Sequence, residues 1–256
     1  MKRIILFLTL LFASFGSTFA SEQTEKFDAG KLIMEHLGDS YYWHIFTYND
    51  LDVSIPLPII LINEGKIDIF MSSKFHHGHS TYKGYKIATE ADGEGLEGSI
   101  ICVDSNGVYT GKKPLDFSIT KNVFAIFIVT GLIVFLVLKG AKIAKKREGQ
   151  APKGLLTVVE YFISFIKDDI ALPSIGEHKY KKYLPYLLTA FLFIFFSNLL
   201  GLFPFFPGGA NITGNIAVTL CLAVFTFVIT NVSGNKGYWK HIINMPGVPW
   251  WLEFPL

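Results

Sequence analysis

Arginine and cysteine are scarce in this sequence of 256 residues. The two cysteines lie in regions of opposite character, Cys102 in an acidic region and Cys221 in an apolar run. This scarcity argues against a disulfide framework and against a cysteine-based metal site. The only arginines, Arg3 and Arg147, lie outside the long apolar runs, so these runs contain no arginine that could take part in moving an ion.

Aspartate, glutamate, lysine and arginine are all absent from residues 183–235, a stretch of 53 residues. About 20 apolar residues cross a bilayer core of roughly 30 Å, so this stretch is long enough for two crossings. A break rich in glycine and proline at residues 204–211 divides it where a turn is needed. We therefore predict a membrane hairpin with spans at 183–203 and 213–232 and an outer turn at 204–212.

The composition is that of a membrane protein, because 50% of the residues are hydrophobic and 24 are phenylalanine. Charge is distributed unevenly. Residues 21–118 carry 15 acidic and 8 basic side chains, whereas residues 119–256 carry 13 basic and 6 acidic ones. An acidic part joined to a basic membrane part indicates two compartments, and we expect no nucleic-acid partner.

The amino terminus has the pattern of a secretory signal. Lys2 and Arg3 precede the apolar run Ile4–Phe12, and small residues follow up to Ala20. We predict a signal peptide at residues 1–20, cleaved after Ala20, with an uncleaved anchor as the alternative. Either form places the mature amino terminus outside the cytoplasm.

Residues 21–116 are predicted to form a small β-rich extracytoplasmic region. A short helix at Ala29–Leu37 precedes its strands. Its candidate strands are Val53–Ile55, Pro58–Ile62, Lys66–Met71, Gly84–Ala88, Ser99–Val103 and Gly107–Thr110. Three closely spaced histidines, His76, His77 and His79, raise the possibility of a metal site. Further ligands at matching spacing are missing, so a polar surface loop is the preferred interpretation and no metal or other cofactor is expected.

A third span is predicted at residues 117–138, and a basic segment follows it directly. Lysines and arginines mark the cytoplasmic side of a span, so this one runs from outside to inside. The cytoplasmic loop 139–182 contains a segment, 154–171, with apolar residues at helical spacing, which predicts an amphipathic helix along the membrane interface. Residues 233–256 form a tail on the same side. The predicted fold is thus all-α integral membrane, with three spans and one interfacial helix.

The second arm of the hairpin carries a polar stripe. Asn215, Thr219, Thr226 and Thr230 lie on one face of a helix, and Asn198 falls near the outer end of the first arm. One interpretation is the wall of an aqueous path. The other is helix packing, since such groups hydrogen-bond across membrane helices for about 1 kcal/mol each. Spacing alone leaves both open.

Two motifs in the hairpin carry a family resemblance. The run Phe195–Pro204 resembles the Asn-Leu-x-(Asp/Gly)-Leu-x-Pro stretch of subunit a of F-type ATP synthases, and Thr213–Ala223 is similar to the next transmembrane helix of that subunit. The order of outer amino terminus, single crossing, cytoplasmic amphipathic helix and hairpin also agrees. The resemblance covers residues 117–256.

The resemblance implies a non-catalytic stator subunit with two offset proton half-channels, working against a rotating ring of c subunits and beside b-type stator subunits in the bacterial inner membrane. Asn198 matches the family's asparagine at the outer half-channel, and Asn215 and Thr219 are weaker proton-path candidates. Gly201 stands where some members have aspartate. The family's essential arginine lies on later helices, so we expect a subunit a that lacks them. Protons and Na⁺ remain alternatives for the coupling ion.

Two other functions are compatible with parts of the sequence. A secondary transporter usually shows internal repeats, and none is visible here. A membrane-anchored envelope protein that binds or assembles through residues 21–118 would need a ligand site in that region, where only the three histidines hint at one.

Overall fold

The computed structural model describes residues 38–48, 51–203, 206 and 208–243, which belong to one compact unit. The predicted signal peptide at 1–20, the predicted helix at Ala29–Leu37 and most of the tail at 233–256 lie outside these residues.

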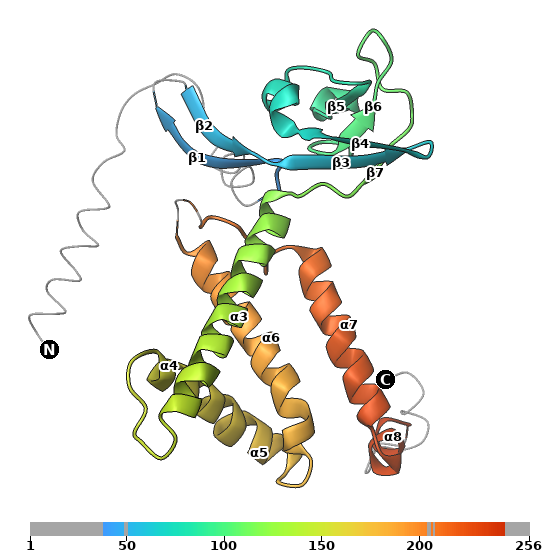
Figure 1. Ribbon diagram of the computed structural model, residues 1–256. Helices are drawn as coiled ribbons and strands as arrows, with labels where there is room; N and C mark the ends of the chain where they lie inside the picture. The colour runs from blue at the N-terminus through green and yellow to red at the C-terminus, as the bar shows by residue number, and fades with distance from the viewer. Residues whose placement is uncertain (1–37, 49–50, 204–205, 207, 244–256) are drawn as a thin grey trace, which may run out of the picture. The chain divides into compact units, whose positions relative to one another are not determined.

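The first part of the described chain is built from short antiparallel strands (Figure 1). Strand β3 lies between β4 and β7, β1 pairs with β2, and β5 pairs with β6. The strands are β1 Tyr42–Tyr48, β2 Leu51–Pro56, β3 Pro58–Asn63, β4 Lys66–Met71, β5 Tyr85–Ile87, β6 Ile100–Cys102 and β7 Leu115–Asp116, and the short 3-10 helices are η1 Ser72–Gly78 and η2 Glu90–Asp92.

Turn chemistry explains the tightest of these hairpins. Glu64 and Gly65 connect β3 to β4 and both have positive φ, 49° and 79°. A two-residue turn of this kind matches the twist of the strands it joins. The first five predicted strands along the chain, from Val53–Ile55 to Ser99–Val103, overlap β2 to β6. The prediction at Gly107–Thr110 is wrong, because that segment contributes only an isolated bridge between Val103 and Tyr109. Strands β1 and β7 were not predicted.

The apolar core of this region lies on one face of the β4–β3–β7 sheet. Ile59 and Leu61 of β3 are fully buried there against the aromatic ring of Phe75, and Phe70 meets that ring edge-on at 5.4 Å. The whole cluster contains Tyr41, Ile59, Leu61, Phe70, Phe75, Tyr85, Ile100 and Cys102. Its members come from four strands, from η1 and, at Tyr41, from the residue before β1, so this core fixes these elements relative to one another.

Two ion pairs make the β-rich region sensitive to acid. Lys83 Nζ lies 2.6 Å from Asp68 Oδ1, and Lys86 Nζ lies 2.6 Å from Asp92 Oδ1. The hydrogen bond from each lysine lowers the pKa of its carboxyl partner below the ordinary value. A carboxyl group with a lowered folded-state pKa contributes stability that is complete above its unfolded value of about 3.9 and is lost as pH falls through the folded pKa.

We therefore expect the β5–β6 hairpin to open more often below about pH 4. Hydrogen exchange measured by mass spectrometry on the reconstituted chain, corrected for intrinsic rates, should show this loss of protection. The Asp68→Asn/Asp92→Asn double variant should already be less protected at pH 6 and should respond less to acid. Equal acid sensitivity in both proteins would contradict this assignment.

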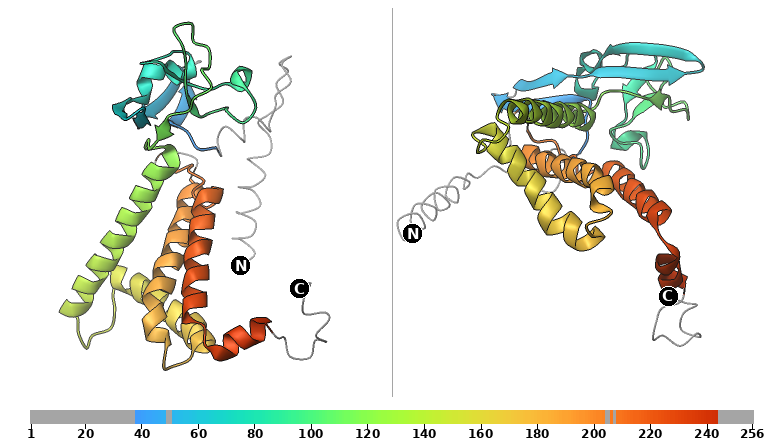
Figure 2. Two further views of the ribbon diagram at one scale, coloured as in Figure 1. Left: turned by 90° about the vertical axis from the view of Figure 1, so that its right-hand side faces the viewer. Right: turned by 60° about the horizontal axis from the view of Figure 1, so that its bottom comes forward.

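Three helices are long and apolar enough to cross a membrane, as predicted (Figure 2). They are α3 Lys121–Lys146, α6 Tyr180–Gly201 and α7 Ile216–Ser233. Helix α3 starts four residues later than the predicted span. It continues past the span through the basic segment to Lys146, because lysine and alanine have high helix propensity. Helix α6, by contrast, starts three residues earlier than the predicted span, at Tyr180.

The amino-terminal end of α3, which is the outer end in the predicted topology, is fastened to the segment before β1. Thr120 caps the helix by accepting from the Val123 N–H and donates its own hydroxyl to Asp39 at 2.7 Å. The Asn122 N–H also donates to Asp39, at 3.0 Å, and the Lys121 N–H donates to the Ser40 carbonyl at 2.8 Å. A carboxylate at this position satisfies the free N–H groups of a helix start and complements its dipole.

The segment between α3 and α6 is helical over a longer range than predicted. Helix α4, Leu155–Ser164, continues as a π-helix, Phe165–Ala171, and then as α5, Leu172–Ile175. The predicted helix at 154–171 ends four residues too early, because the chain stays helical through Pro173 to Ile175, and Gly176 ends it with φ 86°. The wider π-turn just before Pro173 explains this, because it changes the backbone bonding that a proline would otherwise disrupt. After α7 comes the short helix α8, Lys236–Ile243.

Trp43 of β1 joins three parts of the chain at the outer side of the helices. Its side chain is 2% exposed, its indole N–H donates to the Gly208 carbonyl at 3.2 Å, and its ring meets Phe124 and Phe206 edge-on. Ala125 and Val129 of α3 and Ala210 and Ile212 of the turn between α6 and α7 complete this cluster. The strand region, α3 and the outer turn are therefore packed around one indole ring.

Candidate functional site

The outer end of the hairpin holds two of the three proposed proton-path residues. Asn198 lies in the last turn of α6, and its side-chain oxygen accepts from the hydroxyl of Thr213, in the segment that leads into α7. Two residues later Asn215 caps α7, its side-chain oxygen accepting from the Ala217 N–H at 2.9 Å. The link between Asn198 and the start of α7 thus runs through Thr213, which the sequence analysis did not single out.

Thr219, the third candidate, lies one turn further along α7. Its hydroxyl donates to backbone carbonyls of its own helix, those of Ile216 at 3.2 Å and Asn215 at 3.3 Å, and the side chain is exposed. A threonine whose hydroxyl donates to its own helix backbone needs no hydrogen-bond acceptor on a second helix. Its hydroxyl oxygen keeps an acceptor site on the exposed surface of α7.

The inner half of the polar stripe makes a helix contact. The hydroxyls of Tyr186 on α6 and Thr226 on α7 lie 2.7 Å apart, and Thr226 also donates to the Leu222 carbonyl. Around this pair is a pocket of about 350 Å³ that Thr230 and Tyr238 also line. At Thr226 the structure therefore supports the packing interpretation. Tyr186 was missed because one tyrosine in an apolar run carries no pattern.

A buried polar oxygen lies next to Asn198. The side chain of Ser197 is 1% exposed, and its Oγ has no hydrogen-bond partner within the described part of the chain. Burying an unpaired hydroxyl is costly, and such groups often mark the place of an ordered water. Gly201, one turn further on, approaches the Ala210 carbonyl closely, since a Cβ there would lie 3.3 Å from that oxygen. An aspartate at this position, as in some members of the resembled family, would require the Ala210 carbonyl to move by a few tenths of an ångström.

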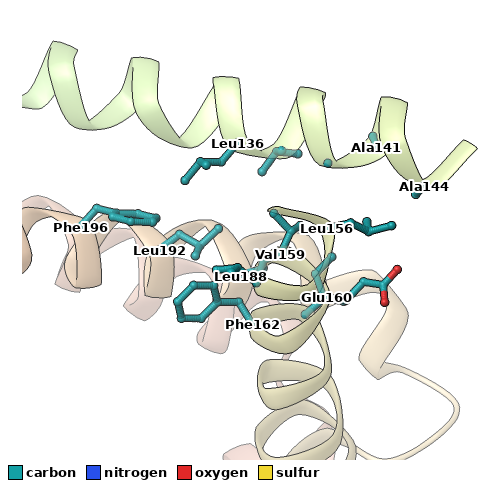
Figure 3. Close-up of a pocket in the computed structure, with 14 residues that line it drawn as sticks. Leu136, Ala141, Ala144, Leu156, Val159, Glu160, Phe162, Leu188, Leu192 and Phe196 are labelled. Carbon is teal, nitrogen blue, oxygen red and sulfur yellow. The ribbon is translucent and has the colours of Figure 1, made fainter. Parts of the chain in front are cut away.

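An apolar pocket of about 280 Å³ lies between α3, α4 and α6 (Figure 3). Aliphatic and aromatic side chains such as Leu136, Leu156 and Leu192 line it. Glu160 is the one ionisable residue in its lining. Its carboxylate lies at one end of the pocket and points away from the apolar side chains (Figure 3). This pocket offers no chain of polar groups, so it is not a route for an ion.

The three histidines are placed as parts of a surface loop. His76 and His77 have positive φ, 45° and 57°, inside η1, and His79 ends it. The His77 ring stacks on Tyr42 with centroids 4.4 Å apart, and its Nε2 is 3.4 Å from the Ser54 hydroxyl. Among the described residues no group of three or more potential ligands is arranged to hold a metal ion.

These features define a helical membrane protein with several spans, whose intramembrane polar groups are concentrated on one hairpin. A model of the family described as ATP synthase A chain matches residues 123–256, more than half of the sequence. The chain belongs to this family, which confirms the resemblance to subunit a. A second family model, described as a domain of unknown function (DUF8433), matches residues 32–117.

Curated relatives agree with this assignment. ATP synthase subunit a 2 of Chlorobaculum tepidum is 50% identical over 133 residues, which are 50% of this chain and 37% of the relative. ATP synthase subunit a of Pelodictyon phaeoclathratiforme is 46% identical over 134 residues, 50% of this chain and 38% of the relative. ATP synthase subunit a of Anaeromyxobacter dehalogenans is 37% identical over 140 residues, 53% of this chain and 34% of the relative. The matched part is thus less than half of each relative. No solved structure matches the chain.

Proposed function

We propose that this chain acts as a stator subunit in the membrane sector of an ATP synthase, where it contributes one wall of the outer proton half-channel. The observation that carries the proposal is the contact between Asn198 and Thr213 beside the Asn215 cap. It gathers two amides and a hydroxyl at the outer end of the hairpin. Membership of the subunit a family supplies the functional context.

In this proposal the outer polar cluster, Asn198, Thr213 and Asn215, binds and orients water that enters from the outer side. Amide and hydroxyl groups cannot themselves change protonation state near neutral pH, so they hold a water chain and do not relay the proton. Thr219 extends the polar surface inward by one turn of α7. The unpaired Ser197 oxygen is an additional water position at the same depth. The proton then passes to a carboxyl group of a c subunit.

The partners in this proposal are the c-ring and the b-type stator subunits. The chain itself carries no catalytic step; it couples proton flow to ATP synthesis elsewhere in the complex. A proton that moves through about 100 mV releases roughly 2.3 kcal/mol. We also propose the bacterial inner membrane as the location, a cleaved signal peptide at 1–20, and an extracytoplasmic mature amino terminus. The α4–α5 segment then lies along the cytoplasmic interface, as its apolar stripe predicts.

The alternative of an envelope protein that binds a ligand through residues 21–118 gains no support from the loop that suggested it. His77 is occupied by its stacking on Tyr42 and its contact with Ser54. The positive φ angles of His76 and His77 turn the chain at this point. Among the described residues they do not bring three potential metal ligands together. We therefore retain a single proposed function.

The test is Asn198→Ala in the assembled ATP synthase, measured as proton-driven ATP synthesis in membrane vesicles. We expect at least a tenfold slower rate, which corresponds to about 1.4 kcal/mol of added barrier. Asn198→Asp keeps an acceptor for the Thr213 hydroxyl and should retain more activity. Asn231→Ala is the matched control, because Asn231 lies near the other end of the hairpin, where its side chain bonds the Phe227 carbonyl and the Tyr238 hydroxyl. Unchanged synthesis in Asn198→Ala complexes of normal subunit content would refute the role.

A further inference from the structure

One face of the β4–β3–β7 sheet is apolar and open. Opposite residues of an antiparallel pair share a face, and the register pairs Ile60 with Ile69 and Ile62 with both Ile67 and Leu115. Phe117 follows Leu115 by two residues and donates its N–H to the Ile60 carbonyl. We call this surface the open face, and its members are Ile60, Ile62, Ile67, Ile69, Met71, Leu115 and Phe117.

The open face is exposed to a degree that is unusual for apolar side chains. Ile67 is 64% exposed, Ile69 66%, Leu115 64% and Phe117 62%. A sheet with one face in water normally places its polar residues on that face. Contiguous apolar patches of this kind mark an interaction surface.

The acidic residues of the same strands lie on the opposite, core side. Asp68 and Asp116 both pair with Leu61, whose side chain is buried in the core. Asp68 accepts from Lys83, and Asp116 accepts from the Tyr41 hydroxyl. The usual alternation is therefore reversed, with charge turned toward the protein and aliphatic side chains turned outward. Although the whole region is acidic, no acidic side chain belongs to the open face.

The sheet is held close to the start of the first span. The Ile119 N–H donates to the Pro58 carbonyl at 2.9 Å, and the Ser118 hydroxyl accepts from the Ile60 N–H at 3.0 Å. Lys121, where α3 begins, follows Leu115 by only six positions, which is at most about 20 Å of chain. Strands β5 and β6 lie on one side of the β3–β4 hairpin, and α3 leaves on the other (Figure 1). The open face and the span thus share one side of the sheet.

We propose that the open face rests on the outer surface of the lipid bilayer that α3 enters. The occupant of the face is then the interfacial zone of the outer leaflet, in which isoleucine, leucine, methionine and phenylalanine side chains are buried among the upper acyl chains. Lys113 is exposed two residues before β7 begins and supplies a cation for lipid phosphate groups. This contact is independent of the proposed proton path and assigns a physical role to a region that a domain of unknown function matches.

The proposal is tested by placing a fluorophore on the open face of the full chain in lipid nanodiscs. In a background with Cys102→Ala and Cys221→Ala, Ile69→Cys is labelled with bimane and measured with phospholipids that carry a doxyl quencher near the headgroup. Asn106→Cys is the matched control, because Asn106 is exposed in a turn of the same region but not on the open face. We expect at least twofold stronger quenching by the doxyl lipid at position 69 than at position 106, and a blue-shifted emission.

Two outcomes would overturn the proposal. If aqueous iodide quenches positions 69 and 106 equally and the doxyl lipid quenches neither, the open face lies in water. If emission at position 69 is blue-shifted without lipid quenching, a protein covers the face instead of lipid. Phe117→Cys, labelled in the same way, provides a second reporter in case the Ile69 variant fails to fold.

Discussion

Replacement of Trp43 by alanine is expected to lower the free energy of unfolding by about 3–5 kcal/mol, the range observed when a buried large aromatic side chain is truncated. The indole is almost fully buried and is the common contact of β1, α3 and the outer turn. Its removal leaves a cavity among Ala125, Val129 and Ile212 and leaves the Gly208 carbonyl without its donor. Thermal unfolding of the reconstituted chain measures the loss. Hydrogen exchange over residues 208–214 shows whether the outer turn opens first.

Trp43→Phe is the matched control. Phenylalanine keeps the ring contacts with Phe124 and Phe206 but has no N–H for the Gly208 carbonyl. The loss of one buried hydrogen bond and part of the ring should cost less, about 1–3 kcal/mol. If Trp43→Ala and Trp43→Phe were equally stable, the packing of the indole would not be what joins the three segments.

Replacement of Gly208 by alanine is expected to disrupt the turn between α6 and α7. A Cβ at this position would lie 2.2 Å from the Phe203 carbonyl oxygen and 2.9 Å from that of Leu200. Backbone atoms at the end of a helix cannot move aside as a side chain tip can, so the turn itself must shift. We expect a cost of about 3 kcal/mol or more. The shift would also break the bond from Trp43 and separate Thr213 from Asn198.

Gly131→Ala is the control for this substitution. Gly131 lies within α3, and a Cβ there would meet no atom within 4 Å. Alanine favours helix over glycine by about 1 kcal/mol, so this variant should be as stable as the original chain or slightly more so. Both effects are measured as shifts in thermal unfolding. Proton-driven ATP synthesis by the assembled complex then separates the two variants functionally. Equal behaviour of the two variants would disprove the close contact at Gly208.

The elements that sequence predicts best here are those that depend on local composition. The three spans follow from long apolar runs, and the hairpin of β3 and β4 follows from Asn63-Glu64-Gly65 between two apolar segments. Strand β1 was missed because its residues, Tyr42–Tyr48, show no regular alternation of polar and apolar side chains. The predicted helix at 154–171 stops short of Ile175, because proline usually disrupts helical backbone bonding and the local pattern takes no account of a preceding π-turn.

The candidate site could be predicted only in part. Helical spacing placed Asn215, Thr219 and Thr226 on one face, but it could not show which of them reaches a second helix. Thr226 does so through Tyr186, and Asn198 is bonded to Thr213. The bond between Trp43 and Gly208 joins residues separated by 165 positions. Partners at such distances are set by the whole fold, so they cannot be read from a local pattern.

Helix α3 also has a mechanical consequence. Its 26 residues form one uninterrupted helix with a length of about 39 Å. The outer end is fixed through Asp39 and Ser40, and near the inner end Gly140 lies close against Val159 of α4. A straight helix held at both ends behaves as a stiff strut. A sideways load on the inner helices is therefore transmitted to the outer β-rich region. In the proposed stator role such a load comes from the turning rotor, and the proposed contact with the bilayer would oppose tilting of the strut.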